Sequence, residues 1–390
     1  MDAKQYFTHT KPESHLNDQK LKAWLCLARD NRFSVLQKHS LLKHFGDPVE
    51  IYQTGYIELC KLLAIKASSQ KNRKFKESLN KGLENDFLWL QNSNNNLICW
   101  GDYLYPDLLG QIADPPVCFF VSGNLELLLE PIVSIVGSRR PTPIGAKMTQ
   151  KVAADLADLG IVISSGMALG IDAVAHQAAL DRGEPTIAVM GCGLDIISPA
   201  RHRQLFENIV RNGLAISEYP IGYPASKYTF PQRNRIVSGL SYGVVIVEAA
   251  QKSGTLITAR LAMEQNREVF VLPGSVISPQ YAGSHNLIKQ GANLVTETTD
   301  IISGLNISLQ AVLDDNEEIN SQSSADKNEQ LLQKFPLLTH IDYQQSTIDQ
   351  IILSSGLTAS EVSSMLLILE IEGLVVVTSC LLYTSPSPRD

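Results

Sequence analysis

Short apolar runs alternate with longer amphipathic stretches through the middle of the chain. The runs consist mainly of aliphatic residues and most end at a glycine; they span residues 132–137, 161–166, 186–191, 214–218, 243–249 and 268–274. Strands covered on both faces of a parallel sheet have this composition. The segments between them, such as AKMTQKVAADLADLG, have helical spacing. The alternation predicts an α/β fold with an extended Rossmann-like parallel sheet at residues 100–305.

The first 85 residues have the pattern of a small helical domain. Three short helical stretches, LKAWLCLARD, VLQKHSLLKHFG and DPVEIYQ, lie within residues 20–62. Gly46 suits a helix C-terminus, and Asp47 followed by Pro48 suits the start of the next helix. The basic segment 66–81 is also predicted to be helical. Its cations favour a solvated helix face, with an auxiliary phosphate contact as the alternative.

The last third of the chain differs again in composition. Residues 306–332 lack an apolar period and are rich in acidic and amide side chains, which predicts a linker. Residues 333–378 predict a winged-helix-like domain: a helix, a turn at Ser355-Gly356, a second helix that a capping box of Thr358 and Glu361 would start, and a strand. Residues 379–390 look foreign to this pattern, and we predict that they are non-native and unstructured.

Composition indicates a soluble globular protein, with 44% hydrophobic and 19% charged residues. No apolar run reaches the roughly 20 residues of a bilayer span, and the N-terminus has no signal-peptide core, so we expect a cytoplasmic protein without membrane contact. The six cysteines contain no CxxC pair and the histidines have no metal-site spacing, so we expect reduced, buried thiols and no metal.

The net charge of −7 is unevenly distributed. Residues 131–305 carry fifteen Lys or Arg against thirteen Asp or Glu, whereas residues 306–390 carry three against twelve. The net charge of the whole chain therefore does not exclude a phosphate-binding surface on the middle domain. The acidic C-terminal region is expected to contact a protein partner or a second subunit, with a purely structural cap as the alternative.

Two of the predicted strands end in loops that suit an anion. Gly137 is followed by Ser138, Arg139 and Arg140 at the start of a helix, where the backbone amides add positive potential. The second strand ends at Gly166, and Asp172 and His176 follow at helical i, i+4 spacing. An acid/base pair is one interpretation of these two side chains. A structural hydrogen-bonded pair is favoured, because no nucleophile or metal ligand accompanies them.

A basic and aromatic segment at residues 227–235 is the most informative part of the sequence. Cations neutralise phosphates and an aromatic face stacks on an unpaired base, which is what a single-stranded nucleic-acid surface requires. The alternative is that the aromatic ring belongs to the core and the arginines pair with carboxylates. The candidate residues are Lys227, Phe230, Arg233, Asn234 and Arg235, to which Lys252, Ser253, Gly254 and Thr255 after the next strand add a further corner.

Ordered motifs over residues 100–300 resemble the DprA/Smf family of DNA-processing proteins. They include SGMALGIDAVAH, TIAVMGCGLD, FPQRNRIVSGLS, KSGTLITARLAME and GSHNLIKQGA. The resemblance implies a homodimer that binds single-stranded DNA without cutting it, protects it and helps to load RecA recombinase, as in natural transformation. It also implies a positive pocket lined by Arg139, Lys227, Phe230, Arg233 and Arg235.

The sequence departs from the family pattern and leaves alternatives open. No Gly-Val-Gly-type hairpin occurs near NRFSVLQKHS, so duplex binding by the helical, SAM- or helix-hairpin-helix-like domain is not predicted. A LOG-like nucleotide N-glycosidic hydrolase is the alternative function. However, Thr258 stands where its catalytic carboxylate would be, and a hydroxyl is a poor general acid or base. Without a GxGxxG fingerprint, no dinucleotide cofactor is expected. We therefore predict a protein with no catalytic residues and no cofactor.

Overall fold

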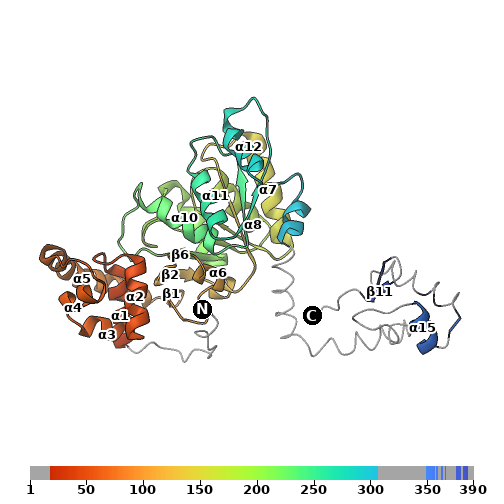
Figure 1. The fold of residues 1–390 in the computed structure, drawn as a ribbon. Helices are drawn as coiled ribbons and strands as arrows, with labels where there is room; N and C mark the ends of the chain where they lie inside the picture. Colours follow the sequence, from red (N-terminus) through yellow and green to blue (C-terminus); the bar gives the residue numbers. More distant parts are fainter. Residues whose placement is uncertain are drawn as a thin grey trace. The chain divides into compact units, whose positions relative to one another are not determined.

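The computed structural model describes residues 18–305, 348–355, 357–358, 362, 365, 375–378 and 381–384. The chain divides into two compact units, Met1–Leu305 and Asn306–Asp390 (Figure 1). The first unit contains α1 (Asp18–Arg29), α2 (Val35–Phe45), α3 (Pro48–Gln53), α4 (Tyr56–Leu62), α5 (Ser69–Leu90), β1 (Asn95–Cys99), α6 (Asp107–Gly110), β2 (Cys118–Gly123), η2 (Leu125–Leu128), β3 (Ile132–Gly137), α7 (Pro143–Asp158), β4 (Val162–Ser165), α8 (Ile171–Asp181), β5 (Thr186–Val189), η3 (Ala200–His202), α9 (Arg203–Asn212), β6 (Leu214–Ser217), α10 (Thr229–Gly239), β7 (Gly243–Val247), α11 (Thr255–Glu264), β8 (Glu268–Val271), η4 (Pro279–Tyr281), α12 (Ala282–Lys289) and β9 (Asn293–Leu294).

A nine-stranded sheet forms the centre of this unit, in the order β1-β2-β6-β5-β4-β3-β7-β8-β9. All six predicted strands are present as β3 to β8, and they are parallel to one another, so the predicted fold class is confirmed. The sequence analysis missed three strands. Two of them, β1 and β2, extend the sheet in antiparallel pairing beyond β6, and β9 pairs parallel with β8.

The strand order reverses at β3. From β3 the chain adds β4, β5 and β6 on one side, and it then returns to add β7 and β8 on the other side of β3. The helices α7, α8 and α9 connect the first series, and α10 and α11 connect the second. Figure 1 shows α7 and α8 on one side of the sheet and α10 and α11 on the other. The connections diverge at the carboxyl ends of β3 and β7, where sheets of this kind leave a crevice for a ligand.

The N-terminal helices pack against the sheet through a shared apolar core. Trp24, Leu25 and Leu27 of α1 are buried in one cluster with Phe120 of β2 and Ala215 of β6. A polar contact reinforces this junction: Arg29 forms an ion pair with the buried Asp86 and also donates to Ile221 O at 2.8 Å. Figure 1 shows these helices beside β1 and β2.

The helix boundaries predicted from local residues are confirmed in this region. The backbone N–H of Gly46 donates to Leu42 O at the end of α2, and the Asp47 side chain accepts from Val49 N at the start of α3. The basic segment 66–81 lies largely within α5. Five of the six cysteines are buried free thiols, as predicted, and Cys380 lies outside the described residues.

Parts of the second unit agree with the winged-helix prediction and one part corrects it. Helix α15 (Ile348–Ser355) ends at the predicted turn, and β10 (Val375–Thr378) is the predicted strand. The prediction that residues 379–390 are unstructured is wrong for β11 (Leu381–Thr384), which pairs antiparallel with β10. The VVVT and LLYT segments are both rich in strand-forming residues, which favours this pairing. Glu361 of the predicted capping box and the whole 306–332 linker lie outside the described residues.

Candidate nucleic-acid interface

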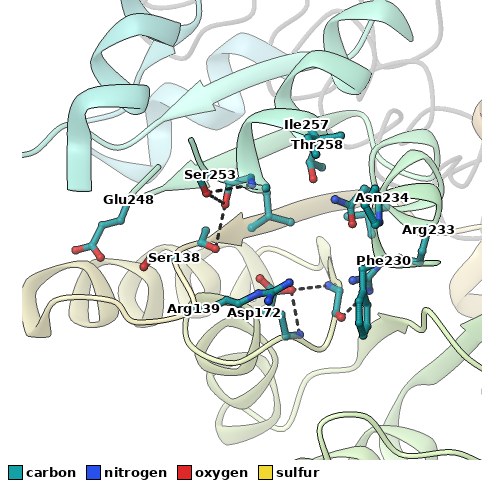
Figure 2. A pocket seen from close by; sticks show the side chains of 18 of the residues that line it. Ser138, Arg139, Asp172, Phe230, Arg233, Asn234, Glu248, Ser253, Ile257 and Thr258 are labelled. Atoms are coloured by element: carbon teal, nitrogen blue, oxygen red, sulfur yellow. Dashed lines mark hydrogen bonds between the residues drawn. The ribbon is translucent and has the colours of Figure 1, made fainter. Parts of the chain in front are cut away.

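A cavity of about 620 Å³ lies at the carboxyl ends of β3, β4 and β7, where the strand order reverses. Figure 2 shows its side chains converging from the β3, β4 and β7 corners and from α10. Its lining includes ten of the thirteen predicted site residues: Ser138, Arg139, Gly166, Lys227, Phe230, Arg233, Asn234, Ser253, Gly254 and Thr255. Corners that are far apart in the sequence therefore meet at one place.

The β3 and β7 corners are held together by close backbone contacts. A Cβ on Gly137 would collide with Val247 O, so only glycine permits this approach. Thr255 Oγ1 donates to Gly137 O at 3.1 Å, which joins the start of α11 to the end of β3. Ser253 Oγ accepts from Thr255 N and Ser138 Oγ accepts from Arg140 N. These contacts fix the loop that carries Arg139.

Two cations of the cavity are available to a ligand. Arg139 and Lys227 both line it and both are exposed. Neither takes part in an ion pair in the part of the chain that the structure describes. Their charges come from different elements, the β3–α7 loop and the segment that leads into α10. Both charges therefore border one cavity although they are distant in the sequence.

Helix α10 presents one face to the cavity. Phe230, Asn234 and Val237 line it and follow the i, i+4, i+7 spacing of a helix face. The Phe230 ring is partly exposed, and Gly191 packs beneath it, since a Cβ there would come within 3.0 Å of Phe230 Cδ1. The aromatic ring of Phe230 and the carboxamide of Asn234 therefore line the same cavity as Arg139 and Lys227.

Arg233 also lines the cavity, but its guanidinium has a structural role. The side chain is buried, and Nη1 donates to Gly166 O at 2.5 Å and to Val189 O. Gly166 permits this, because a Cβ there would lie 2.5 Å from Nη1. Burial lowers the pKa of Arg233, and nearby Asp172 opposes that shift. The predicted phosphate contact is thus corrected: Arg233 joins the ends of β4 and β5.

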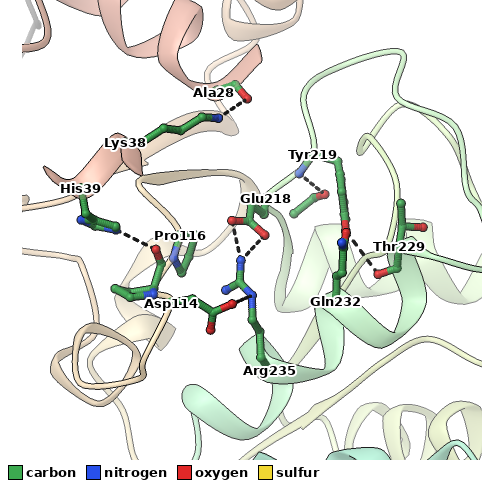
Figure 3. A network of polar contacts seen from close by, with 12 residues as sticks. Ala28, Lys38, His39, Asp114, Pro116, Glu218, Tyr219, Thr229, Gln232 and Arg235 are labelled. Atoms are coloured by element: carbon green, nitrogen blue, oxygen red, sulfur yellow. Dashed lines mark hydrogen bonds and ion pairs between the residues drawn. The ribbon is translucent and has the colours of Figure 1, made fainter. Parts of the chain in front are cut away.

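Arg235 does not reach the cavity. Its guanidinium is buried, donates to Glu218 Oε1 at 2.6 Å and lies 3.2 Å from Asp114 Oδ2 (Figure 3). The predicted phosphate contact of Arg235 is therefore wrong for this structure, because two carboxylates already neutralise the charge. Residues 233 and 235 are two apart on a helix, so their side chains point about 200° away from each other.

Arg140 and Lys252 are exposed but are not among the lining residues of the cavity. Arg140 directly follows the lining residue Arg139, and Lys252 directly precedes the lining residue Ser253. They can contribute positive potential near the opening, and a direct contact with a ligand inside it remains a proposal for these two side chains.

Glu248 is a cavity residue that the sequence analysis did not select. Its backbone is left-handed, with φ of 56°, and its carboxylate is buried. It accepts hydrogen bonds from Thr142 N at 2.9 Å, from Thr142 Oγ1 and from the Tyr281 hydroxyl. The protein's own carboxylate therefore occupies the N-terminus of α7, where an external anion had been expected. An acidic residue directly after a buried strand, as in VVIVEA, was the available signal.

Asp172 and His176 have structural roles, as predicted, but each forms its hydrogen bonds with other residues and not with its predicted partner. Asp172 Oδ2 accepts from Gly166 N and Ala168 N, which shapes the loop after β4. His176 Nδ1 lies 2.8 Å from Thr186 Oγ1, whose hydroxyl donates to Ile163 O. Nδ1 must therefore carry the proton, and Nε2 is buried without a partner. Burial lowers the pKa of His176 to about 3.

The buried imidazole predicts a pH-dependent loss of stability. Unfolded chains protonate histidine below a pKa of about 6.5, whereas folded His176 stays neutral down to about pH 3, so stability falls as the pH falls through this window. Between about pH 7.5 and about pH 5, wild type should lose about 2 kcal/mol more unfolding free energy than His176→Gln in urea titrations. Equal losses in the two proteins would contradict the neutral assignment.

Comparison with known proteins identifies the family. The family model described as DNA recombination-mediator protein A matches residues 96–306, and that of the DprA winged helix domain matches residues 323–378. The chain belongs to the DprA/Smf family. Protein Smf of Escherichia coli is 41% identical over 296 residues, which cover 76% of this chain and 79% of that protein. DNA processing protein DprA of Streptococcus pneumoniae is 46% identical over 202 residues, covering 52% of this chain and 71% of that protein.

A solved structure of the family has the same fold. The X-ray structure of DNA processing protein A from Streptococcus pneumoniae matches with a TM-score of 0.65 and 35% identity, and the match covers 72% of this chain and 97% of that one. The winged-helix family model matches residues 323–378, in the C-terminal part of the chain where the sequence predicts such a domain.

Two further observations concern other kinds of site. In the described part of the chain, no cluster of three or more His, Cys, Asp or Glu side chains is arranged to bind a metal ion. Among the helices that the structure describes, none combines the length and the apolar character needed to cross a bilayer.

Proposed function

We propose that the chain binds single-stranded DNA in the cavity formed by β3, β4, β7 and α10. One observation carries this proposal: two exposed cations without ion pairs, Arg139 and Lys227, border a cavity whose wall includes the partly exposed ring of Phe230. Cations for phosphates and an aromatic face for a base are the two requirements of such a site.

The volume of the cavity and the partly exposed ring in its wall favour an unpaired strand over a duplex. A volume of about 620 Å³ is within the range of pockets for small organic ligands, so it can receive a nucleotide but not a double helix. In a duplex both faces of each base are covered by stacking, and the Phe230 ring would have no free base to contact. We therefore infer that single strands bind more tightly than duplexes, with little sequence preference.

We further propose that the protein acts as a recombination mediator without catalytic activity of its own. The two carboxylates of the cavity, Asp172 and Glu248, already accept hydrogen bonds from the backbone or from hydroxyl groups. Thr258, in place of the carboxylate of a LOG-like hydrolase, also lines the cavity. The family resemblance supports a homodimeric cytoplasmic protein that protects the strand and delivers it to RecA.

A fluorescence titration tests the binding proposal. The intact chain is titrated with a labelled single strand and with a duplex of the same length over a series of salt concentrations. We expect tighter binding of the single strand and an affinity that falls linearly with salt on a double-logarithmic plot, at about 0.7 per phosphate contact. Binding that does not respond to salt, or equal affinity for both ligands, would contradict the proposal.

A further inference from the structure

Lys227 and Phe230 both line the cavity, and Lys227 also lies beside a second aromatic side chain that is outside it. Phe230 is part of the lining, whereas the Tyr228 ring is outside it and is 69% exposed. Lys227 Nζ is 5.1 Å from the centroid of the Tyr228 ring. Lys227 therefore shares the cavity with one aromatic ring, Phe230, and contacts a second, exposed ring, Tyr228.

The Tyr228 ring has no evident structural task. Tyr228 precedes the first residue of α10, but its side chain makes no capping hydrogen bond. The turn is held instead by Ser226, whose Oγ accepts from Tyr228 N and from Thr229 N at 3.2 Å each. An exposed ring that neither packs in the core nor caps a helix is available for an external partner.

Hydrogen bonds and ring stacking hold the chain on both sides of Tyr228. Tyr219 is buried and its hydroxyl donates to Thr229 O at 3.3 Å, and its ring stacks on Tyr223 with 4.9 Å between centroids. Gly193 N donates to Tyr223 O at 2.9 Å, which ties this segment to the loop after β5. The backbone that carries Tyr228 is therefore held in place without a ligand, which limits the backbone ordering entropy that binding would cost.

We propose that Tyr228 is a second stacking platform, which binds the base adjoining the one on Phe230. In a nucleic-acid strand each phosphate joins two nucleosides, so a cation that lines a cavity together with one ring and lies beside a second ring can match one base–phosphate–base step. Lys227 pairs with the phosphate of that step. The site deepens the proposed single-stranded DNA function and rests on it, and it extends the bound strand beyond the cavity along the loop between β6 and α10.

A length series of labelled oligothymidylates tests this site by fluorescence anisotropy. Tyr228→Ala should bind the shortest ligands as wild type does, and longer ones about tenfold more weakly, whereas Tyr228→Phe keeps wild-type affinity. Tyr103→Ala is the matched control, because Tyr103 is also exposed, at 42%, and does not line the cavity. Tyr228→Leu keeps apolar bulk without a ring and should behave like Tyr228→Ala.

A second measurement separates stacking from an indirect effect on Lys227. In the shortest oligothymidylate that responds to Tyr228→Ala, a single abasic position is moved along the strand. One position should weaken wild-type binding about tenfold and Tyr228→Ala binding hardly at all. The proposed stacking role of Tyr228 is disproved if Tyr228→Ala binds oligothymidylates of every length as tightly as wild type does. It is also disproved if every abasic position weakens binding by Tyr228→Ala as much as it weakens binding by wild type. Failure of wild type to bind single strands, or indifference to Arg139→Ala, would instead refute the proposed function.

Discussion

Arg139→Ala is expected to weaken single-stranded DNA binding by tenfold or more. The Arg139 side chain lines the cavity, is exposed and has no carboxylate partner within the described residues, so its charge is free for a phosphate. A hydrogen bond to a charged group contributes about 1.5–3 kcal/mol, which corresponds to about 10- to 150-fold in affinity. Loss of one phosphate contact should also reduce the salt slope by about 0.7. Fluorescence titration over a salt series measures both quantities.

A matched variant distinguishes a specific contact from a change in net charge. Arg260→Ala removes an exposed arginine of α11 that is not among the cavity residues, so its affinity and salt slope should stay close to those of wild type. Lys227→Ala should resemble Arg139→Ala. If Arg139→Ala and Arg260→Ala lower the affinity equally, general electrostatic attraction rather than the cavity explains the binding.

Arg235→Met is expected to destabilise the fold by about 3 kcal/mol while leaving the DNA contacts in place. Removing the guanidinium leaves Glu218 without its main partner in a site where the two side chains are only 8% and 17% exposed. Breaking a buried pair from one side costs about 3–5 kcal/mol, and the lower figure suits this partly exposed carboxylate. Urea denaturation measures the loss, and DNA titration well below the unfolding transition measures binding.

The matched control for this change is a surface arginine with the same kind of partner. Arg182 forms a two-point ion pair with Asp158, and both side chains are well exposed, so Arg182→Met should change the unfolding free energy little. The double variant Arg235→Met/Glu218→Leu should regain most of the lost stability, because it removes the buried charge as well. If Arg235→Met keeps wild-type stability and instead weakens DNA binding like Arg139→Ala, Arg235 is a phosphate contact after all.

The two arginines of α10 explain why the composition of a segment overstated the positive charge of the site. A stretch of nine residues with three cations suggests a single basic surface, and its sequence does not say which charges meet carboxylates. Once residues 229–239 form a helix, Arg233 and Arg235 must point in different directions. One meets the carbonyl groups at the ends of β4 and β5, and the other meets Glu218. The helical spacing was visible in the sequence, but the carbonyl and carboxylate partners were not.

Glu248 illustrates a different limit of prediction from sequence, because its contact partner is distant in the chain. A helix N-terminus attracts an anion, and the sequence analysis assigned that position at α7 to an external phosphate. The structure brings the end of β7 beside the start of α7, and Glu248 binds Thr142 there. These residues are 106 apart in the chain, so only the pairing of β3 with β7 reveals the contact. We therefore expect the proposed anion site to lie on the side of the cavity near Arg139, Lys227 and Phe230.

The α/β fold, the six central strands, the helical N-terminal region, the family and ten of the 21 residues that line the cavity could be predicted from the sequence. These features depend on local hydrophobic period, on turn residues and on motifs whose members are close together in the chain. The tertiary structure alone decided which cations are free, which are buried as braces, and which carboxylate fills a helix terminus. Charge availability depends on partners that are distant in sequence, and the packing of β3, β7 and α10 brings those partners together.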